Sequence, residues 1–238
     1  MNHDVYKRHI ENQSTHWWFQ ARKKIIETII KNKFKKKLEI LDFGSGSGVN
    51  VKMFSKFGFV NIYEPHNKTR FYLKKKFRNK KRFNVLNNFP TKKFDLIIMA
   101  DVLEHIKDDK GIIKKLSNHL KKGGYILVTV PAFQLLFSKK DVALGHFRRY
   151  NLKDLKIVFK RFEQKRLTYF NFFLFFPISF LILFFKTFKL DFINEVEKAP
   201  NFFVNRLMYS LFIIEKNLLR IINFPFGISI LGLFRKND

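Results

Sequence analysis

Short apolar runs alternate with amphipathic stretches over the first half of the chain. The runs predict buried strands at residues 38–43, 59–63, 83–86, 94–100 and 125–130. The stretches between them predict helices at 49–56, 66–77 and a third that Asp108 or Asp109 caps and that Gly123 and Gly124 end. Parallel strands covered on both faces are almost wholly apolar, so the pattern predicts an α/β fold with a doubly wound, mainly parallel sheet.

Helical patterns flank this alternating region. Residues 16–30 carry Trp18, Ala21, Ile25 and Ile29 on one face, and Ser14 or Thr15 is the expected cap. After Pro131 the pattern predicts a loop to Tyr150, a helix at 151–160, a strand at 162–170, apolar helical stretches at 172–185 and 202–222, and a closing strand at 227–234.

The 238 residues are enough for one α/β domain with a sizeable insertion. We expect an N-terminal helical cap over 1–37, an α/β core over 38–170, an apolar helical insertion over 171–224, and a closing strand of the core sheet over 225–238. The insertion would serve as a lid or face a membrane.

Composition narrows the chemistry. The chain has no cysteine, which excludes disulfides, thiolate metal sites and a cysteine nucleophile. We expect no metal. A general lysine bias spread over every solvated face is the main expected cause of the net charge of +28, and whatever its origin this charge favours anionic lipids or phosphorylated substrates. No specific nucleic-acid partner is expected. Residues 1–11 are polar and lack the apolar core of a signal peptide, so we expect a cytoplasmic protein.

Residues 167–185 contain no charged side chain over 19 positions, which reaches the length of a spanning helix. Pro177 interrupts the run, and basic residues flank both of its ends. These features favour a segment that lies in the interface of an anionic membrane, on the inner face, over one that crosses it. The alternative is an insertion that packs on its own domain.

A glycine-rich loop lies between the first predicted strand and the next helix. Gly44, Gly46 and Gly48 alternate with other residues there, and Glu64 closes the second strand 22 residues after Asp42. Such a loop lets a ligand approach the backbone closely, and a carboxylate at that distance can accept ribose hydroxyls. The spacing differs from the dinucleotide pattern, which disfavours a nicotinamide-dependent oxidoreductase.

Three motifs in order resemble those of the Rossmann-like, class I S-adenosylmethionine-dependent methyltransferases. They are Asp-Phe-Gly-Ser-Gly-Ser-Gly at 42–48, Phe-Asp-Leu-Ile-Ile-Met-Ala-Asp-Val-Leu-Glu-His-Ile at 94–106, and the segment 120–131. His-Trp-Trp-Phe at 16–19, Gly-His-Phe-Arg-Arg-Tyr at 145–150 and Pro-Phe-Gly-Ile-Ser at 225–229 are similar to a bacterial subgroup associated with cell-envelope saccharide or lipid pathways. The resemblance implies an antiparallel last strand and S-adenosyl-L-methionine as cofactor.

The resemblance also implies a role for each residue of the cofactor site. Gly44, Ser45, Gly46 and Gly48 would contact the methionine part, Asp42 would orient the loop, Glu64 would hold the ribose, and Ala100 and Asp101 would lie near the methionyl group. Many relatives bind the adenine amine with an acidic residue after the third strand. Asn87 or Asn88 stands there in this chain.

The sequence says less about the residues that would bind and activate the methyl acceptor. Methyl transfer needs a general base only when the acceptor is a hydroxyl or a protonated amine. The candidates are His146, Asp141 and His105, for which a structural loop residue or a pocket wall is the alternative. Arg148 and Arg149 could clamp a phosphate or carboxylate, with Tyr150 beside them, and Trp17 and Trp18 could form a lid or anchor the first helix in the core.

The predicted activity is methyl transfer to a small-molecule, saccharide or lipid-linked acceptor in cell-envelope biosynthesis. A catalytically inactive membrane- or nucleic-acid-binding module on the same fold is the alternative from another class.

Overall fold

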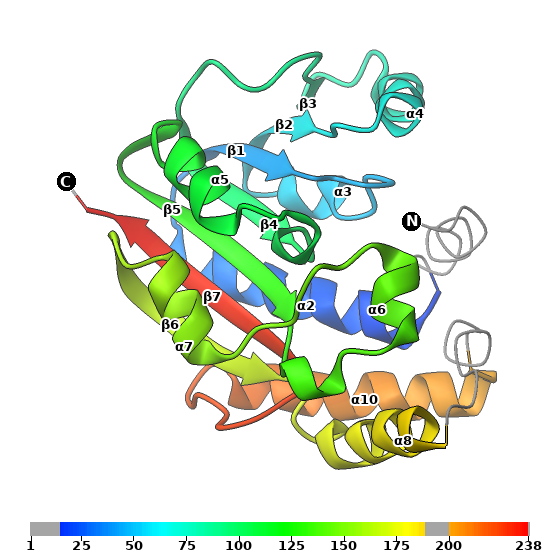
Figure 1. The fold of residues 1–238 in the computed structure, drawn as a ribbon. Helices are drawn as coiled ribbons and strands as arrows, with labels where there is room; N and C mark the ends of the chain where they lie inside the picture. Colours follow the sequence, from blue (N-terminus) through cyan, green and yellow to red (C-terminus); the bar gives the residue numbers. More distant parts are fainter. Residues whose placement is uncertain (1–14, 189–199, 238) are drawn as a thin grey trace.

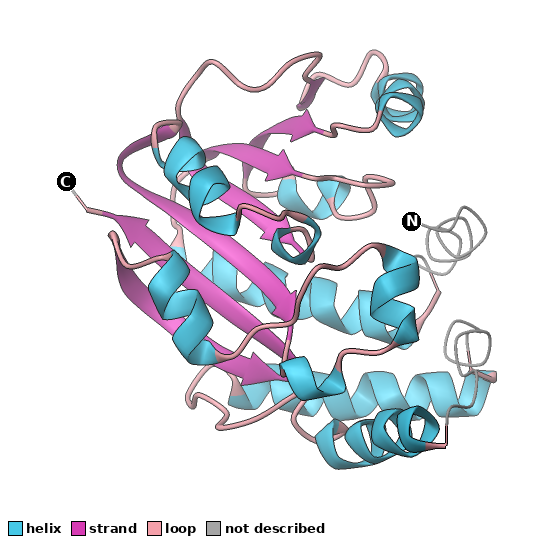
Figure 2. Ribbon diagram, in the orientation of Figure 1, coloured by secondary structure: helices cyan, strands magenta, loops and turns pink. Residues whose placement is uncertain are grey.

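The structure is a computed structural model that describes residues 15–188 and 200–237. Within these residues, one seven-stranded sheet forms the centre of the molecule, with helices on both of its sides (Figure 2). Residues 1–14 of the expected cap, including Ser14, lie outside the described residues. The same holds for residues 189–199 of the expected insertion, including Lys189.

The sheet has the strand order β3-β2-β1-β4-β5-β7-β6 (Figure 1). Neighbouring strands from β3 to β5 pair in parallel, and β7 pairs antiparallel with both β5 and β6. The predicted mainly parallel sheet with an antiparallel last strand is therefore confirmed. The strands are β1 (Leu38–Phe43), β2 (Gly58–Tyr63), β3 (Phe83–Val85), β4 (Phe94–Ala100), β5 (Leu120–Pro131), β6 (Phe162–Phe170) and β7 (Ser229–Lys236).

Helices cover both faces, as expected for a doubly wound sheet. In Figure 1, α5 and α7 lie in front of the sheet and α2 lies behind it. The helices are α2 (Trp17–Lys33), α3 (Val51–Phe54), α4 (Asn67–Phe77), α5 (Asp109–Ser117), α6 (Lys139–Leu144), α7 (Leu152–Val158), α8 (Phe175–Thr187) and α10 (Phe202–Leu218), with short 3₁₀ turns η1 (Leu103–His105) and η2 (Gln134–Leu136).

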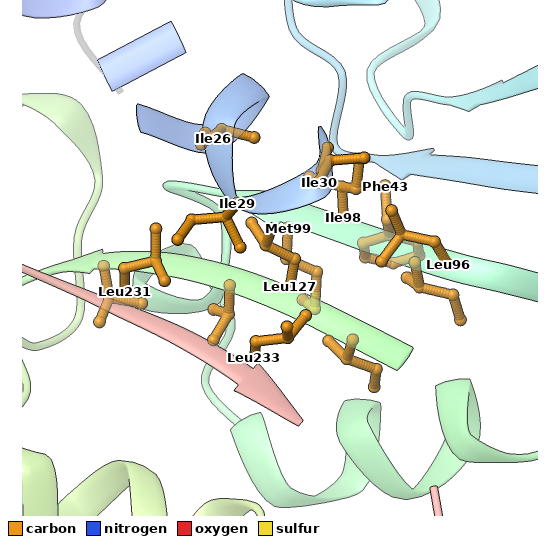
Figure 3. Close-up of a cluster of buried hydrophobic side chains, with 14 of the residues drawn as sticks. Ile26, Ile29, Ile30, Phe43, Leu96, Ile98, Met99, Leu127, Leu231 and Leu233 are labelled. Carbon is orange, nitrogen blue, oxygen red and sulfur yellow. The ribbon is translucent and has the colours of Figure 1, made fainter. Parts of the chain in front are cut away.

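The core lies where α2 packs on the sheet. Ile26 and Ile30 of α2 lie in one cluster with side chains of β4 and β5, among them Ile98 and Leu127 on the sheet face that α2 covers (Figure 3). All four are fully buried. Burying an isoleucine, leucine or methionine side chain contributes about 1.5–3 kcal/mol each. This interface fixes the helix that carries Arg22 toward the carboxyl ends of the strands.

Four local predictions were wrong, each for a physical reason, and the first two concern the ends of helices. His16 caps α2 in place of Ser14 or Thr15: burial lowers its pKa to about 4, so the neutral ring accepts the Trp18 backbone N–H. Gly123 and Gly124 lie inside β5, where the pairing with β4 shifts register, and Gly123 has a φ of 65° in that bulge.

The loop expected between Pro131 and Tyr150 contains η2 and α6. A capping box between Ser138 and Asp141 starts α6, and Gly145 ends it in the left-handed conformation. Pro177 lies in the first turn of α8, where the missing N–H breaks no helical bond, so the apolar run continues past it.

The insertion carries two long helices at one end of the molecule, below the edge strand β6 in Figure 1. Asn205 of α10 accepts the backbone N–H of Trp17 at 2.8 Å and thereby ties α10 to the start of α2. Glu215 of α10 is completely buried and accepts the backbone N–H groups of Asn171 and Phe172 at the end of β6. Neither helix, nor any other in the described residues, is both long and apolar enough to cross a membrane.

Candidate active site

Three glycines form a tight turn after β1. Gly44, Gly46 and Gly48 have positive φ angles of 74°, 54° and 70°, which favour glycine over other residues. Gly44 donates its backbone N–H to the carbonyl of Tyr63 at 2.8 Å, so the turn is fixed against the end of β2. A Cβ on Gly46 would have no heavy atom within 4 Å. The loop therefore leaves room for a ligand at the carboxyl end of β1.

Glu64 faces this loop from the end of β2. Its carboxylate accepts the backbone N–H of Gly46 at 2.9 Å and that of His66 at 3.0 Å. An ionised carboxylate has about four acceptor positions, so both oxygens keep capacity for a hydroxyl donor. The structure thus brings Glu64 and the glycine loop together, and its contact with ribose remains a prediction.

Asp42 lies beneath the loop and holds it. Its Oδ2 accepts the Ser45 hydroxyl at 2.5 Å. Burial raises the pKa of Asp42 to about 7, the hydrogen bond from Ser45 opposes this shift, and the neighbouring Glu64 adds to it. This geometry is that of a residue that orients the turn.

β4 ends in an unusual backbone conformation. Asp101 has a φ of 55°, which is uncommon for a residue with a side chain and often marks a functional site. Its carboxylate accepts the Thr129 hydroxyl at 2.7 Å and pairs with the buried Arg22 of α2. Ala100 precedes it at the end of the strand. Asp101 is therefore fixed at the mouth of the sheet, where the methionyl group is expected.

The expected adenine contact lies after β3. Asn87 and Asn88 are both exposed, two and three residues beyond the end of the strand. Both amides are therefore accessible to a ligand next to β2, and the choice between them stays open.

A charged cluster stands over the ends of β4 and β5. Asp141 of α6 forms two hydrogen bonds of 2.9 Å with the Arg149 guanidinium, and it also accepts from the His146 ring and the Ser138 backbone. Although burial opposes it, these donors hold the pKa of Asp141 well below its usual range. Asp141 is almost completely buried, and its hydrogen bonds orient His146 and Arg149.

His146 meets His105 in this cluster. The two rings pack edge to face with centroids 4.6 Å apart. Burial and the neighbouring His146 lower the pKa of His105 to about 4, so the His105 ring is neutral at neutral pH. The structure therefore brings all three candidate bases together, and the catalytic role of each remains a prediction.

Sequence reasoning missed Glu104 as a site residue. It is completely buried next to His105, and burial raises its pKa to about 8. Neither carboxylate oxygen has a hydrogen-bond partner among the described residues. The available signal was a glutamate within an apolar segment directly after a buried strand.

Arg148 and Tyr150 join the same loop to α5. Arg148 pairs with Asp109 at 3.0 Å, and the Tyr150 hydroxyl donates to Asp109 at 3.1 Å. Tyr150 is 1% exposed, and its assignment as a substrate contact remains a prediction. Arg149 is occupied by Asp141, whereas Arg148 stays partly exposed. A substrate role for either arginine remains a prediction.

The two tryptophans expected at the lid pack against the core. Trp18 stacks on Phe170 of β6 with centroids 5.7 Å apart, and Trp17 contacts Phe212 of α10 at 5.4 Å. These contacts show them as anchors between α2 and the insertion. A contact with substrate remains a prediction.

The sheet order, the glycine turn and Glu64 together define a Rossmann-like fold with a nucleotide-type site at the carboxyl ends of its strands. Residues 15–165 match the family described as a methyltransferase domain, and the chain belongs to that family. The predicted recognition as a Rossmann-like methyltransferase is therefore confirmed. The narrower resemblance to a bacterial subgroup stays a prediction. No curated protein matches the chain with significance.

Solved structures share the fold over nearly the whole chain. The N-methyltransferase NodS from Bradyrhizobium japonicum, in complex with S-adenosyl-L-homocysteine, has a TM-score of 0.60 at 10% identity, over 99% of this chain and 98% of that one. YcgJ from Bacillus subtilis has a TM-score of 0.58 at 14% identity, over 90% and 98%.

Coclaurine N-methyltransferase, bound to N-methylheliamine and S-adenosylhomocysteine, has a TM-score of 0.58 at 14% identity, over 89% of this chain and 72% of that one. Two of these three structures thus hold the product that S-adenosylmethionine leaves after methyl transfer. The predicted cofactor is confirmed at the level of the family.

Proposed function

We propose that this protein binds S-adenosyl-L-methionine in the turn after β1 and transfers its methyl group to a small-molecule, saccharide or lipid-linked acceptor in cell-envelope biosynthesis. The observation that carries the proposal is the contact between Glu64 and Gly46. It places a carboxylate with free acceptor capacity beside a glycine turn that has open space.

The residues present fit this cofactor. Gly46 leaves room for the amino-acid part, Glu64 has acceptors for the ribose hydroxyls, and Asp101 stands at the end of β4. The cofactor supplies a methyl group on a positively charged sulfur, which leaves as a neutral thioether. The protein therefore mainly has to orient the acceptor opposite the sulfur.

His146 is the proposed base for a hydroxyl or ammonium acceptor. Asp141 accepts a hydrogen bond from its Nδ1, which leaves Nε2 with a lone pair. Positioned this way, the ring can take a proton from an acceptor that enters over β5. Arg149 holds Asp141 in place for this task.

Calorimetric titration with S-adenosylmethionine and with NAD⁺ tests the proposal. We expect binding of S-adenosylmethionine alone, with affinity reduced about 5- to 150-fold in Glu64→Ala, because charge-assisted hydrogen bonds of about 1–3 kcal/mol are lost. Glu64 also holds the loop, so Glu64→Gln serves as a milder variant. Glu39→Ala, at the opposite end of β1, is the control. Binding of NAD⁺ alone, or no binding at all, would contradict the proposal and favour an oxidoreductase or an inactive module.

We further propose that the insertion docks on an anionic membrane. On α8, Phe176, Phe180 and Phe184 recur every four residues, and Phe176 and Phe180 are each 67% exposed. On and beyond α10, the exposed large apolar side chains are Phe202, Phe203, Val204, Leu207, Ile214, Leu218, Ile221 and Ile222. Exposed apolar surface of this extent is unusual unless it meets a partner or a membrane.

Basic side chains accompany these helices. Arg206 and Arg220 of the α10 segment are exposed, and the chain as a whole carries a charge of +28. Each basic residue near an anionic membrane contributes about 1 kcal/mol, and apolar burial adds to it. This combination supports a membrane surface over a protein partner.

The same helices border the expected acceptor entrance. Phe175 of α8 contacts Phe133, which follows β5, with ring centroids 5.4 Å apart. Lys186 of α8 donates to the carbonyl of Leu135 in η2. An acceptor with a lipid tail could therefore stay in the membrane while its polar part reaches the site.

Sedimentation with anionic liposomes tests the docking. We expect binding at low salt that the double variant Phe176→Ser/Phe180→Ser weakens at least tenfold. Phe175 faces inward, so it is left intact. Phe71→Ser/Tyr72→Ser on α4 removes two similarly exposed aromatic rings and should leave binding unchanged. Equal binding by both double variants, or none by the wild type, would argue for a self-packed insertion.

A further inference from the structure

Three ligand-type side chains converge where η1 faces the loop after α6. One ligand atom each from Glu104, His105 and His146 can be chosen so that all three lie within 4.8 Å of one another. We propose that these residues bind a divalent transition-metal ion. No metal was expected from the sequence, because Glu104 and His105 are far from His146 along the chain.

The buried carboxylate is the first observation behind this site. Glu104 is 0% exposed, and both of its oxygens lack a hydrogen-bond partner among the described residues. Buried polar groups are nearly always satisfied, and a buried carboxyl group without any partner is costly in a protein interior. A cation between Glu104 and the two imidazoles would supply the missing partner.

The neighbouring arginines do not fill this role. Arg22 pairs with Asp101, and Arg149 is held by both oxygens of Asp141. Each positive charge therefore already has its own carboxylate. Glu104 is the acid of this region without a direct ionic partner in the described residues, and a bound cation would supply one.

The second observation is that both histidines are oriented as ligands are. Asp141 accepts from Nδ1 of His146 at 2.9 Å, which fixes the tautomer and leaves the Nε2 lone pair available. The backbone carbonyl of Gly145 accepts from the His105 ring, which frees its other nitrogen. Metal-bound histidines almost always donate their second N–H to a carboxylate or a backbone carbonyl in this way.

The ligand set indicates the kind of metal. Two imidazole nitrogens and one carboxylate suit Zn²⁺, Fe²⁺ or Mn²⁺, whereas Mg²⁺ and Ca²⁺ prefer oxygen ligands alone. Three protein ligands also leave coordination positions open, as in catalytic sites. We take Zn²⁺ as the probe, because it binds such sets tightly and has no redox chemistry.

The place of the metal site in the fold suggests which ligand would occupy its free coordination positions. Val102, two residues before Glu104, lies against Gly44, since its methyl carbons would be 2.7–2.8 Å from a Cβ there. The metal site would therefore lie next to the cofactor turn. It would hold an acceptor by its oxygen atoms, which narrows the acceptor to a hydroxyl or carboxylate compound. This narrowing rests on the function proposed above, whereas the metal site does not.

The transfer then balances as an ordinary O-methylation. With a metal ion bound to its Nε2, His146 no longer acts as the base, so a hydroxyl acceptor releases its proton to water, while a carboxylate has none to release. An oxygen lone pair forms the new bond to the methyl carbon. The bond from that carbon to sulfur breaks, and its electron pair stays on the sulfur of S-adenosylhomocysteine.

Metal binding is measured without cofactor or acceptor, on full-length protein first dialysed against a chelator. Calorimetric titration with Zn²⁺ should give one ion per chain, and Mg²⁺ should bind at least 100-fold more weakly. Glu104→Gln and His146→Ala should each weaken Zn²⁺ binding at least tenfold. His119→Ala removes a histidine beside Phe89, outside the cluster, and is the matched control.

Asp141 would position the His146 ring for the metal, and Asp141→Asn tests this role separately. The variant keeps all three ligands and should weaken Zn²⁺ binding about 10- to 100-fold. Because Asp141→Asn also disturbs the fold, a second measurement is needed, and the visible spectrum of the Co²⁺-loaded protein provides it. The wild type should show the absorption bands of tetrahedral or five-coordinate Co²⁺. Glu104→Gln should alter these bands. Absence of a bound ion in the wild type, or unchanged Zn²⁺ binding in Glu104→Gln and His146→Ala, would overturn the site. Failure of S-adenosylmethionine to bind would instead overturn the proposed function.

Discussion

Glu215 offers a test of how the insertion is held on the core. This side chain of α10 is 0% exposed, and its carboxylate accepts the backbone N–H groups that follow β6. Burial raises its pKa from 4.5 to about 7, although these N–H groups act in the opposite direction. We therefore expect the folded protein to bind a proton at Glu215 that the unfolded chain has already released at neutral pH.

The sign of the effect follows from linkage. An acid whose pKa is raised by folding contributes stability that is fully present below its unfolded pKa of 4.5 and is lost as the pH rises through 7. A shift of this size corresponds to about 3 kcal/mol in all, of which about 2.5 kcal/mol falls between pH 5 and pH 8.

The measurement is the free energy of unfolding in urea for the wild type and Glu215→Gln. Asp42 and Glu104, whose pKa values are also raised, titrate in the same range, but they contribute equally to both proteins. The stability of the wild type relative to the variant should fall by about 2.5 kcal/mol from pH 5 to pH 8. Glu163→Gln, at an exposed acid of β6, should show no such change.

The opposite slope would refute this reasoning. If the wild type gains stability over Glu215→Gln as the pH rises, the backbone N–H groups outweigh burial and the pKa of Glu215 lies below 4.5. Glu215 would then be an ionised anchor of α10 at every physiological pH.

Two further predictions concern the site. Gly48→Ala should lower the free energy of unfolding by about 3 kcal/mol, because its Cβ would lie 2.7 Å from Leu73 and 2.9 Å from Phe77 in addition to the strain of a positive φ. Gly46→Ala meets no neighbour and should cost only about 1 kcal/mol of strain, so equal losses in urea unfolding would contradict the steric argument. Asp141→Asn should cost about 3 kcal/mol at pH 7, since its partners lose a buried carboxylate. The low pKa of Asp141 means that this difference shrinks as the pH falls toward 3, and a difference independent of pH would count against it.

Most of the fold could be predicted because its signals are local. The run at 94–100 is apolar at nearly every position and forms β4 with the expected bounds, and the run at 38–43 forms β1. The glycine turn and Glu64 were also recognisable, since a turn and a strand end leave marks in adjacent residues. Their mutual contact then follows from parallel pairing of β1 and β2.

What sequence reasoning missed depends on residues that are distant along the chain. Nothing near Glu104 shows that its carboxylate lacks a partner, because that is decided by where the loop carrying His146 passes. The residues around Trp17 and Trp18 likewise do not show whether the two side chains form a lid or pack in the core. Their packing depends on Phe170 and Phe212, which lie about 150 to 200 residues later.

The place of β7 in the sheet has a consequence for how the chain is made. β7 follows β6 in the chain, yet it lies between β5 and β6 and pairs with both. Until Ser229–Lys236 has been synthesised, β5 therefore keeps one edge of unpaired backbone groups and β6 keeps two. Such edges can recruit strands of other chains. A premature stop before Ser229 would thus remove an interior strand and leave these edges of β5 and β6 unpaired, so we expect such truncated chains to aggregate or be degraded.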